Sequence, residues 1–260
     1  MHQEYLSSTK NPNILLARSL KQKKGRDESG CFLVEGKKAV GDALEAGFVP
    51  EMLFALEDQL SSLPPASLPQ DARLYVVPEH VLAAVCDTMT PQGICCVMRK
   101  QDTHVKGRRL VALDGVQDPG NVGTILRTSD AAALDGVLLS SACADPYAPK
   151  VVRATMGSIF HIPFQMVPSL PEALRALKEE GITLISTQLD GKPFFEAVPS
   201  LPESFCLVIG NEGQGVTEEV REMCDIALKL PMPGRAESLN ASVAAGILIY
   251  EMLFGCGRSS

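Results

Sequence analysis

The sequence has no uninterrupted apolar run of about 18 residues, the length that a membrane-spanning helix requires. Its first residues, MHQEYLSSTKNPNILLARSL, lack the basic start, apolar core and small-residue cleavage site of a signal peptide. Apolar residues make up 45% of the chain and charged residues 21%, which is normal for a globular protein. We therefore expect a cytoplasmic protein with no membrane partner.

Clustered metal ligands are also missing. None of the eight cysteines forms a CxxC pair, and the four histidines offer no HxxxH pair. Zinc sites need such closely spaced ligands, so the sequence predicts no metal site. Stretches such as GICCVM and SFCLVIG instead predict free, buried thiols in a reducing compartment. The cysteines are Cys31, Cys86, Cys95, Cys96, Cys143, Cys206, Cys224 and Cys256.

The chain lacks a net positive charge, but its charges are unevenly distributed. The net charge is −7, with 14 basic and 13 acidic side chains in residues 1–109 against 10 and 18 in residues 110–260. The segment RSLKQKKGR has five positive charges and no negative one, and such a patch can bind phosphates despite an acidic total. The alternative is a solvated helix face. The candidate RNA-binding residues are Arg18, Lys21, Lys23, Lys24 and Arg26.

The polar segment 101–109 separates two parts of the sequence. Residues 1–100 predict a smaller α/β domain with strands at 31–36, 51–56, 73–78 and 93–98, and helices at 11–22, 37–47 and 78–86. In residues 110–260, apolar strands alternate with helices, which predicts a mostly parallel sheet with helices on both faces. Such sheets bind ligands at the carboxyl ends of their strands, so the loops there are the places to look for chemistry.

The first of these loops is LDGVQDPGNVGTILRTSD. Asn121 can cap the following helix, and Gly123 and Arg127 lie four residues apart on one helix face. A glycine there leaves room for a ligand beside the arginine. The alternative is an ordinary turn followed by a surface arginine.

The second loop, VIGNEGQGV, is rich in glycine and follows an apolar strand. Glycines let a ligand approach the backbone closely. The Lys-Ser/Thr pair of nucleotide triphosphate-binding loops is absent, and the spacing GxxGxG differs from the dinucleotide pattern GxGxxG. A metabolic enzyme that holds a nucleotide in this loop is therefore the weaker alternative.

The third loop, LPMPGRAESLN, precedes an apolar C-terminal helix. Ser238 can cap that helix, but capping does not account for Arg235, Glu237 and Asn240 at the same entrance.

Taken in order, NxGxxxR, GNEGxG and PMxGxxESLNxSVA resemble the three signature motifs of the SpoU/TrmH family of RNA ribose 2′-O-methyltransferases, within the SPOUT superfamily. The resemblance covers residues 110–255, and FLVEGKKAV in the first part resembles the ribosomal-protein-like substrate-binding domain often found before this catalytic domain. The family implies S-adenosylmethionine as cofactor, a C-terminal trefoil knot and a homodimer. It also implies an RNA substrate, which we expect to be ribosomal RNA rather than transfer RNA.

The resemblance also implies roles for individual residues. It gives Arg127 a contact to the target ribose or its phosphate, while Glu212 and Asn240 are either catalytic or structural. An arginine stays protonated and is a poor general base, so electrostatic activation of the 2′-hydroxyl is the favoured role. A non-catalytic RNA-binding protein on the same scaffold is the main rival. The implied catalytic residues are Arg127, Asn121, Glu212, Ser238 and Asn240. The implied cofactor-binding residues are Thr187, Gln188, Leu189, Gly210, Asn211, Gly213, Leu230, Met232, Ser238 and Leu239.

Overall fold

The computed structural model describes residues 2–62, 72–101 and 103–255, which pack into two compact units. The first unit takes the described residues up to Gln101 together with the later segment Asp145–His161. The second unit takes the described residues of 103–144 and 162–255. By packing, the segment 145–161 belongs to the first unit, although in the sequence it lies among the elements of the second.

A sheet with the strand order β1-β4-β3-β5-β2 forms the centre of the first unit. Strands β1, β4 and β3 run parallel, and β5 runs antiparallel to both β3 and β2. The strands are β1 (His2–Tyr5), β2 (Cys31–Glu35), β3 (Pro50–Ala55), β4 (Arg73–Val76) and β5 (Ile94–Arg99). The helices are α1 (Pro12–Ser19), α2 (Lys23–Ser29), α3 (Lys37–Glu45), α4 (Glu79–Val85) and the 3₁₀ helix η1 (Glu57–Ser62).

Helix α1 begins as its sequence predicts. The Asn11 side chain accepts a hydrogen bond from the backbone N–H of Asn13 at 2.9 Å, and Pro12 occupies the first helical position. The helix buries Ile14 and Ala17 in a core shared with β2, β3, β4 and α4. Its basic residue Arg18 is exposed to solvent.

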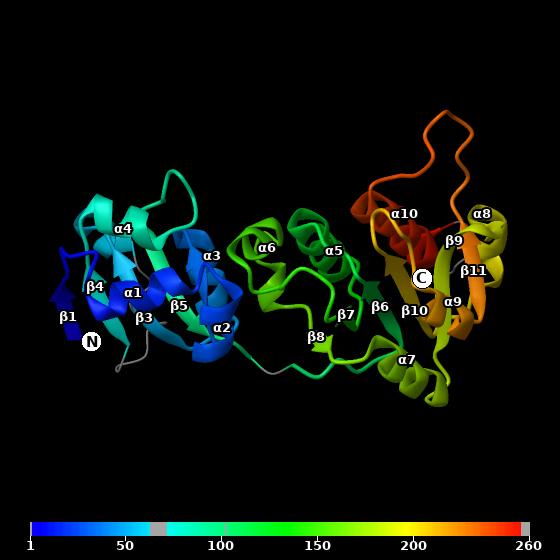
Figure 1. Ribbon diagram of the computed structural model, residues 1–260, viewed down its shortest axis with the longest axis horizontal. Helices are drawn as coiled ribbons and strands as arrows, with labels where there is room; N and C mark the ends of the chain where they lie inside the picture. The colour runs from blue at the N-terminus through cyan, green and yellow to red at the C-terminus, as the bar shows by residue number, and fades with distance from the viewer. Residues whose placement is uncertain (1, 63–71, 102, 256–260) are drawn as a thin grey trace. The chain divides into compact units, whose positions relative to one another are not determined.

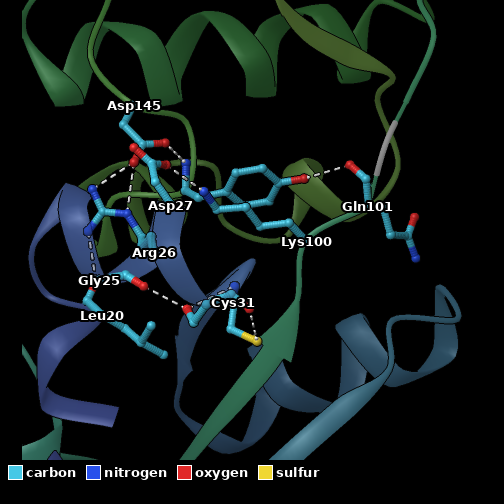
Figure 2. A network of polar contacts seen from close by, with 10 residues as sticks. Leu20, Gly25, Arg26, Asp27, Cys31, Lys100, Gln101 and Asp145 are labelled. Carbon is cyan, nitrogen blue, oxygen red and sulfur yellow. Dashed lines mark hydrogen bonds and ion pairs between the residues drawn. The ribbon is translucent and has the colours of Figure 1, made fainter. Parts of the chain in front are cut away.

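A buried ion pair and aromatic packing are among the contacts that hold the segment 145–161 in the first unit. Figure 2 shows the Arg26 guanidinium beside Asp145, with Nη2 and Oδ2 2.7 Å apart. The rings of Phe32 and Tyr147 have centroids 4.7 Å apart, and the Phe48 and Phe160 rings pack edge to face. Helices α6 (Pro149–Ala154) and η3 (Ser158–Phe160) lie in this segment.

The second unit contains a parallel six-stranded sheet with the order β11-β9-β10-β6-β7-β8 (Figure 1). Strands β6, β7 and β10 are almost entirely buried, as their continuous apolar sequences predict. The strands are β6 (Arg109–Asp114), β7 (Gly136–Ser140), β8 (Phe164–Val167), β9 (Thr183–Pro193), β10 (Phe205–Gly210) and β11 (Ile226–Lys229). The predicted parallel α/β fold is confirmed.

Helices cover both faces of this sheet. Helices α7 (Leu170–Glu179) and α9 (Glu218–Met223) pack together over Leu110, Ala112 and Val208. Helices α5 (Pro119–Ala131) and α10 (Ala241–Phe254) pack on each other and against β7 and β10. Short helices α8 (Phe194–Ala197) and η4 (Val198–Ser200) follow β9. Within the described part of the chain, none of the helices has both the length and the apolar character of a membrane span.

Candidate active site at the carboxyl end of the parallel sheet

The three predicted loops meet in one chain of side-chain hydrogen bonds. Asn240, from the third loop, donates from Nδ2 to Oδ1 of Asn121 at 2.8 Å. Asn121 in turn donates from its own Nδ2 to Oε1 of Glu212, in the glycine-rich loop, at 2.9 Å. Residues separated by about ninety to one hundred and twenty positions in the sequence are thus joined directly.

Backbone N–H donors set the direction of every hydrogen bond in this series of side chains. Oδ1 of Asn240 accepts the backbone N–H groups of Ser242 at 3.0 Å and Val243 at 3.3 Å, and also the Ser242 hydroxyl. The amide nitrogen of Asn240 must therefore face Asn121 and meet its oxygen. That leaves the amide nitrogen of Asn121 to donate to an acceptor, which is the Glu212 carboxylate.

Glu212 also receives two backbone donors from the first loop. The N–H of Asp118 lies 3.1 Å from Oε1, and that of Gln117 lies 3.2 Å from Oε2. Partial burial acts to raise the pKa of Glu212, but the hydrogen bonds from Asn121 and these N–H groups outweigh it and leave the pKa lowered. Glu212 is therefore an ionised acceptor at neutral pH and is poorly suited to act as a base.

Two predicted helix caps are wrong. Helix α5 is capped by Asp118, whose side chain accepts the N–H of Asn121 at 2.9 Å, and Pro119 is its first residue. Asn121 lies inside the first turn, so its side chain is free to join the network. Helix α10 is capped by Asn240 rather than by Ser238, which is exposed in the preceding loop.

The glycine-rich loop is folded by Asn211. Its Oδ1 accepts the N–H groups of Gly213 and Gln214, and its Nδ2 donates to the carbonyl of Gly115 at 2.8 Å. A Cβ atom on Gly210 would lie only 2.1 Å from the backbone carbon of Gly215, so no other residue fits where the loop closes. The Asn211 side chain therefore shapes the loop.

Arg127 lies on α5, two turns after the cap, and its side chain is exposed. Among residues 2–62, 72–101 and 103–255, no carboxylate forms an ion pair with it. Asp135, a possible structural partner, instead accepts the backbone N–H groups of Arg108 and Arg109. The guanidinium is thus available to an external anion.

Apart from Gly210, Asn211 and Gly213 of the glycine-rich loop, the predicted cofactor residues lie in β9 and in the loop after β11. Thr187 and Gln188 are half-buried in β9, while the Leu189 side chain is outside what the structure describes. Leu230 and Met232 are half-buried at the start of the loop between β11 and α10, and Leu239 at its end is exposed. Figure 1 shows this loop as a long orange excursion. Within the described chain, residues 230–239 make no hydrogen bond to other residues, so their backbone groups can serve a ligand.

The basic cluster of α1 and α2 divides into exposed and engaged residues. Arg18, Lys23 and Lys24 are exposed, with Lys24 only 3.7 Å from Glu28. Lys21 donates to the backbone carbonyls of Ala84 and Cys86. Arg26 is buried, and besides Asp145 it binds the carbonyl of Leu20 at 2.7 Å. The placement of Arg26 contradicts its predicted contact with RNA.

The cysteines are free, as predicted, in the part of the chain that the structure covers, and all but Cys224 are buried. Burial raises the pKa of the Cys96 and Cys206 thiols, which keeps them protonated. Cys256 lies outside the described residues. Within those residues, His, Cys, Asp and Glu side chains form no group of three or more that could hold a metal ion.

The sequence analysis missed two residues that bond to this network, Gln117 and Asp118. The order Asp118–Pro119 is the signal that could have found them, because an aspartate cap followed by proline at the first helical position is a common helix start. Counting from this cap places Asn121 inside the helix.

Comparison with known proteins identifies the family. Residues 108–250 match the model of the SpoU rRNA Methylase family, and residues 11–96 match the MRM3-like substrate binding domain. The chain belongs to the SpoU rRNA methylase family, which confirms the resemblance carried by the three motifs.

Several relatives are similar along almost the whole chain. The 23S rRNA (guanosine(2553)-2′-O)-methyltransferase RlmP of Bacillus subtilis is 38% identical over 95% of this chain and 98% of its own length. An rRNA methyltransferase from Sinorhizobium meliloti, solved with bound AdoMet, is 32% identical with a TM-score of 0.86, covering 96% and 97% of the two chains. The SpoU methyltransferase AviRb from Streptomyces viridochromogenes, in complex with AdoMet, is 26% identical with a TM-score of 0.84, covering 94% and 97%.

Proposed function

We propose that the protein transfers the methyl group of S-adenosylmethionine to a ribose 2′-hydroxyl in ribosomal RNA. The observation that carries this proposal is the joining of all three motifs by Asn121, Glu212 and Asn240. Arg127 lies on the same helix as Asn121 and has no ion-pair partner among the described residues. The similarity to a 23S rRNA 2′-O-methyltransferase over nearly the whole chain supports ribosomal RNA as the substrate.

The residues at the ends of β9 and β11 fit the methyl donor. S-adenosylmethionine supplies an electrophilic sulfonium methyl group, so methyl transfer needs no metal. The chain needs to bind and orient the cofactor. Half-buried Leu230 and Met232 offer apolar surface, and the unbonded backbone of 230–239 offers donors and acceptors for the adenosine edges. Gly210, Gly213, Ser238 and Leu239 complete this proposed pocket.

Arg127 is the residue proposed to act on the RNA. Its planar, permanently charged guanidinium grips phosphate in a two-pronged geometry and stabilises the negative charge that develops on the ribose oxygen. Among the described residues, no carboxylate pairs with Arg127, so its positive charge remains available to the substrate.

Asn121, Glu212 and Asn240 are proposed to be positioning residues. Their hydrogen-bonding groups face one another and the backbone, so they fix the N-terminus of α5 against the glycine-rich loop and the start of α10. Arg127 follows Asn121 on α5, and the loop 230–239 directly precedes Asn240. The network therefore holds the acting residue and the cofactor loop in one arrangement.

We further propose that the protein is a cytoplasmic homodimer that pairs through α10. Val243, Tyr250 and Phe254 expose 51%, 46% and 65% of their surface, and with half-buried Ile247 they form one apolar stripe on this helix. We also propose that the chain forms the trefoil knot expected of the family. In the same way, we propose that residues 1–100 bind RNA and residues 110–260 transfer the methyl group, a division that the two family models support, although the segment 145–161 packs in the first unit.

Transfer of labelled methyl groups tests the proposed activity. The full chain with labelled S-adenosylmethionine should label ribosomal RNA, and digestion should place the label on one ribose. Label found only in transfer RNA would show that transfer RNA, and not ribosomal RNA, is the substrate. Cofactor binding without methylation of any RNA would favour a non-catalytic RNA-binding protein and overturn the proposal.

A further inference from the structure

A small groove lies in the first unit, at the edge of the sheet where β2, β3 and β4 begin and β5 ends, and α1 contributes one wall. Its volume is about 240 Å³. Pockets that enclose a whole drug-sized molecule measure about 300–1,000 Å³, so this groove suits a single flat group. The lining residues used below are Leu16, Glu51, Met52, Arg73, Val97 and Arg99.

The floor and one wall of the groove are apolar. Met52 and Val97 belong to the core of the first unit, and they form the floor with only 4% and 1% of their surface exposed. Leu16 of α1 leaves 42% of its surface exposed and supplies the apolar wall. Such a surface favours a ligand with a flat, weakly polar face.

Two arginines at the rim differ in what they already bind. Nε of Arg99 donates to Oε1 of Glu51 at 2.8 Å, so this guanidinium is held in place and its charge is balanced. Arg73, the first residue of β4, is exposed and forms no ion pair within the part of the chain that the structure describes. The rim therefore keeps one net positive charge, which lies on Arg73.

A nucleotide of unpaired RNA matches this groove in shape and in charge. Bases in loops and bulges are splayed out, and they stack on flat groups such as arginine guanidinium planes. Each nucleotide also brings one negative phosphate, which pairs with a free arginine. A paired base is stacked within its own helix and cannot enter. Leu16, Glu51 and Arg73 all lie in residues 11–96, which match the MRM3-like substrate binding domain.

We propose that this groove binds one unpaired nucleotide of the RNA substrate. The base lies over Met52 and Val97, between Leu16 and the Arg99 guanidinium, and its phosphate pairs with Arg73. The inference rests on the proposed function and adds an RNA contact in the first unit, whereas the residues proposed for methyl transfer belong to the second.

The groove is separate from the exposed basic cluster of α1 and α2. Arg18 follows Leu16 by two residues, which places the two side chains on opposite sides of α1. The cluster presents charge without an apolar floor, so it contacts the phosphates of paired and unpaired RNA alike. Only the groove distinguishes an unpaired nucleotide from a paired one.

RNA binding by the full chain tests the proposal through two groove variants. Leu16→Glu places a negative charge in the wall, and Arg73→Gln removes the positive charge at the rim. Leu15→Glu is the matched control, because Leu15 is the preceding residue of α1, is 48% exposed and does not line the groove. The probes are a short fluorescent single-stranded RNA of mixed sequence and the same strand annealed to its complement.

We expect both groove variants to bind the single strand less tightly by anisotropy. Leu16→Glu should weaken binding roughly ten- to hundredfold, the range for the loss of one stacked base. Arg73→Gln should reduce the slope of log affinity against log salt concentration by about 0.7, the value for one phosphate of a single strand. The duplex should bind almost as it does to wild type, and Leu15→Glu should resemble wild type with both probes.

Thermal denaturation should show an intact fold in all variants, because the changed side chains are exposed. In methylation of ribosomal RNA, Leu16→Glu should raise KM and leave kcat nearly unchanged, as expected for a contact made equally before and during the reaction. Equal single-strand affinity of Leu16→Glu and Leu15→Glu, or an equal loss for duplex and single strand, would overturn the inference.

Other outcomes separate this inference from the proposed activity. Normal single-strand binding together with loss of a dimer in Leu16→Glu, measured by sedimentation, would assign the groove to a second copy of the chain and overturn the inference. Methylation by wild type would stand in that case. A wild-type chain that methylates no RNA would instead overturn the proposed function, while the anisotropy comparison would still decide whether the groove binds unpaired RNA.

Discussion

Asn240 and Asn121 are 119 residues apart in the sequence, yet their side-chain amides meet at 2.8 Å. The same Asn240 side chain caps α10, and the same Asn121 side chain binds Glu212. Since one amide serves the helix cap and the network together, the start of α10 cannot shift without breaking the bonds to α5.

Removing the charge of Glu212 should destabilise this arrangement. Glu212→Gln keeps the size but replaces one acceptor oxygen by an NH₂ group, which then faces a backbone N–H or the amide of Asn121. We expect a loss of about 1–3 kcal/mol in the free energy of unfolding, measured by urea denaturation. Glu219→Gln, on the exposed surface of α9, is the control and should change little. Equal stability of both variants would contradict the network.

The lowered pKa of Glu212 predicts how this contribution depends on pH. A carboxyl whose pKa is lower in the folded state stabilises the fold fully above its unfolded pKa of about 4.3. That contribution is lost as the pH falls through the lower folded value. The stability difference between wild type and Glu212→Gln should thus be constant near neutral pH and shrink below about pH 4. Urea titrations between pH 3 and pH 7 measure it, and a difference that grows on acidification would have the wrong sign.

Arg127 should be needed for turnover rather than for folding or cofactor binding. Both Arg127→Ala and Arg127→Lys should lower the single-turnover rate by about a hundredfold or more, because lysine keeps the charge but loses the planar fork. Thermal stability and cofactor affinity should stay near wild type, since no described carboxylate pairs with the side chain. Arg175→Ala, exposed on α7, is the control. Near wild-type methylation by either variant would rule out the proposed role.

The basic cluster should separate into two classes of variant. Replacing Arg18 and Lys23 by glutamine should weaken RNA binding and reduce the slope of affinity against salt concentration by about one unit for each phosphate that is no longer bound. Arg26→Gln should instead destabilise the protein by about 3–5 kcal/mol, because it leaves Asp145 buried without its partner. Filter binding at several salt concentrations and thermal denaturation distinguish the two. An unchanged salt slope would show that the exposed charges are only solvated.

The apolar stripe of α10 should hold two copies together. Tyr250→Asp and Phe254→Asp place a charge among exposed apolar side chains whose rings lie 5.5 Å apart. Sedimentation equilibrium should show a dimer for wild type and a monomer for the double variant. Phe195→Asp, exposed on α8, is the matched control. A wild-type monomer at all accessible concentrations would contradict the proposal.

The order of strands and helices is predictable because apolar periodicity is a local property. The runs at β6 and β10 are recognisable by themselves, and so is α1 with its Asn11 cap. The short strand β8 is not, because Phe164–Val167 has few residues and only its two ends are buried.

The sequence could not predict the contacts between residues that are far apart in the chain. Asn121 resembles a cap in the sequence because its neighbour in space, Glu212, lies 91 positions away. Arg26 resembles its basic neighbours because its partner Asp145 lies 119 positions away. In both cases the role of a polar side chain is decided by a carboxylate that no local pattern contains.

The segment 145–161 limits how this protein can be divided. A fragment ending at residue 100 would lack Asp145, Tyr147 and Phe160, and would leave Arg26, Phe32 and Phe48 without the groups that cover them. Exchange of the first part between relatives would meet the same obstacle unless the later segment were exchanged with it. Substitutions of Arg26 and Asp145 should accordingly occur together among relatives. Arg26 lies in the region that matches one family model and Asp145 in the region that matches the other.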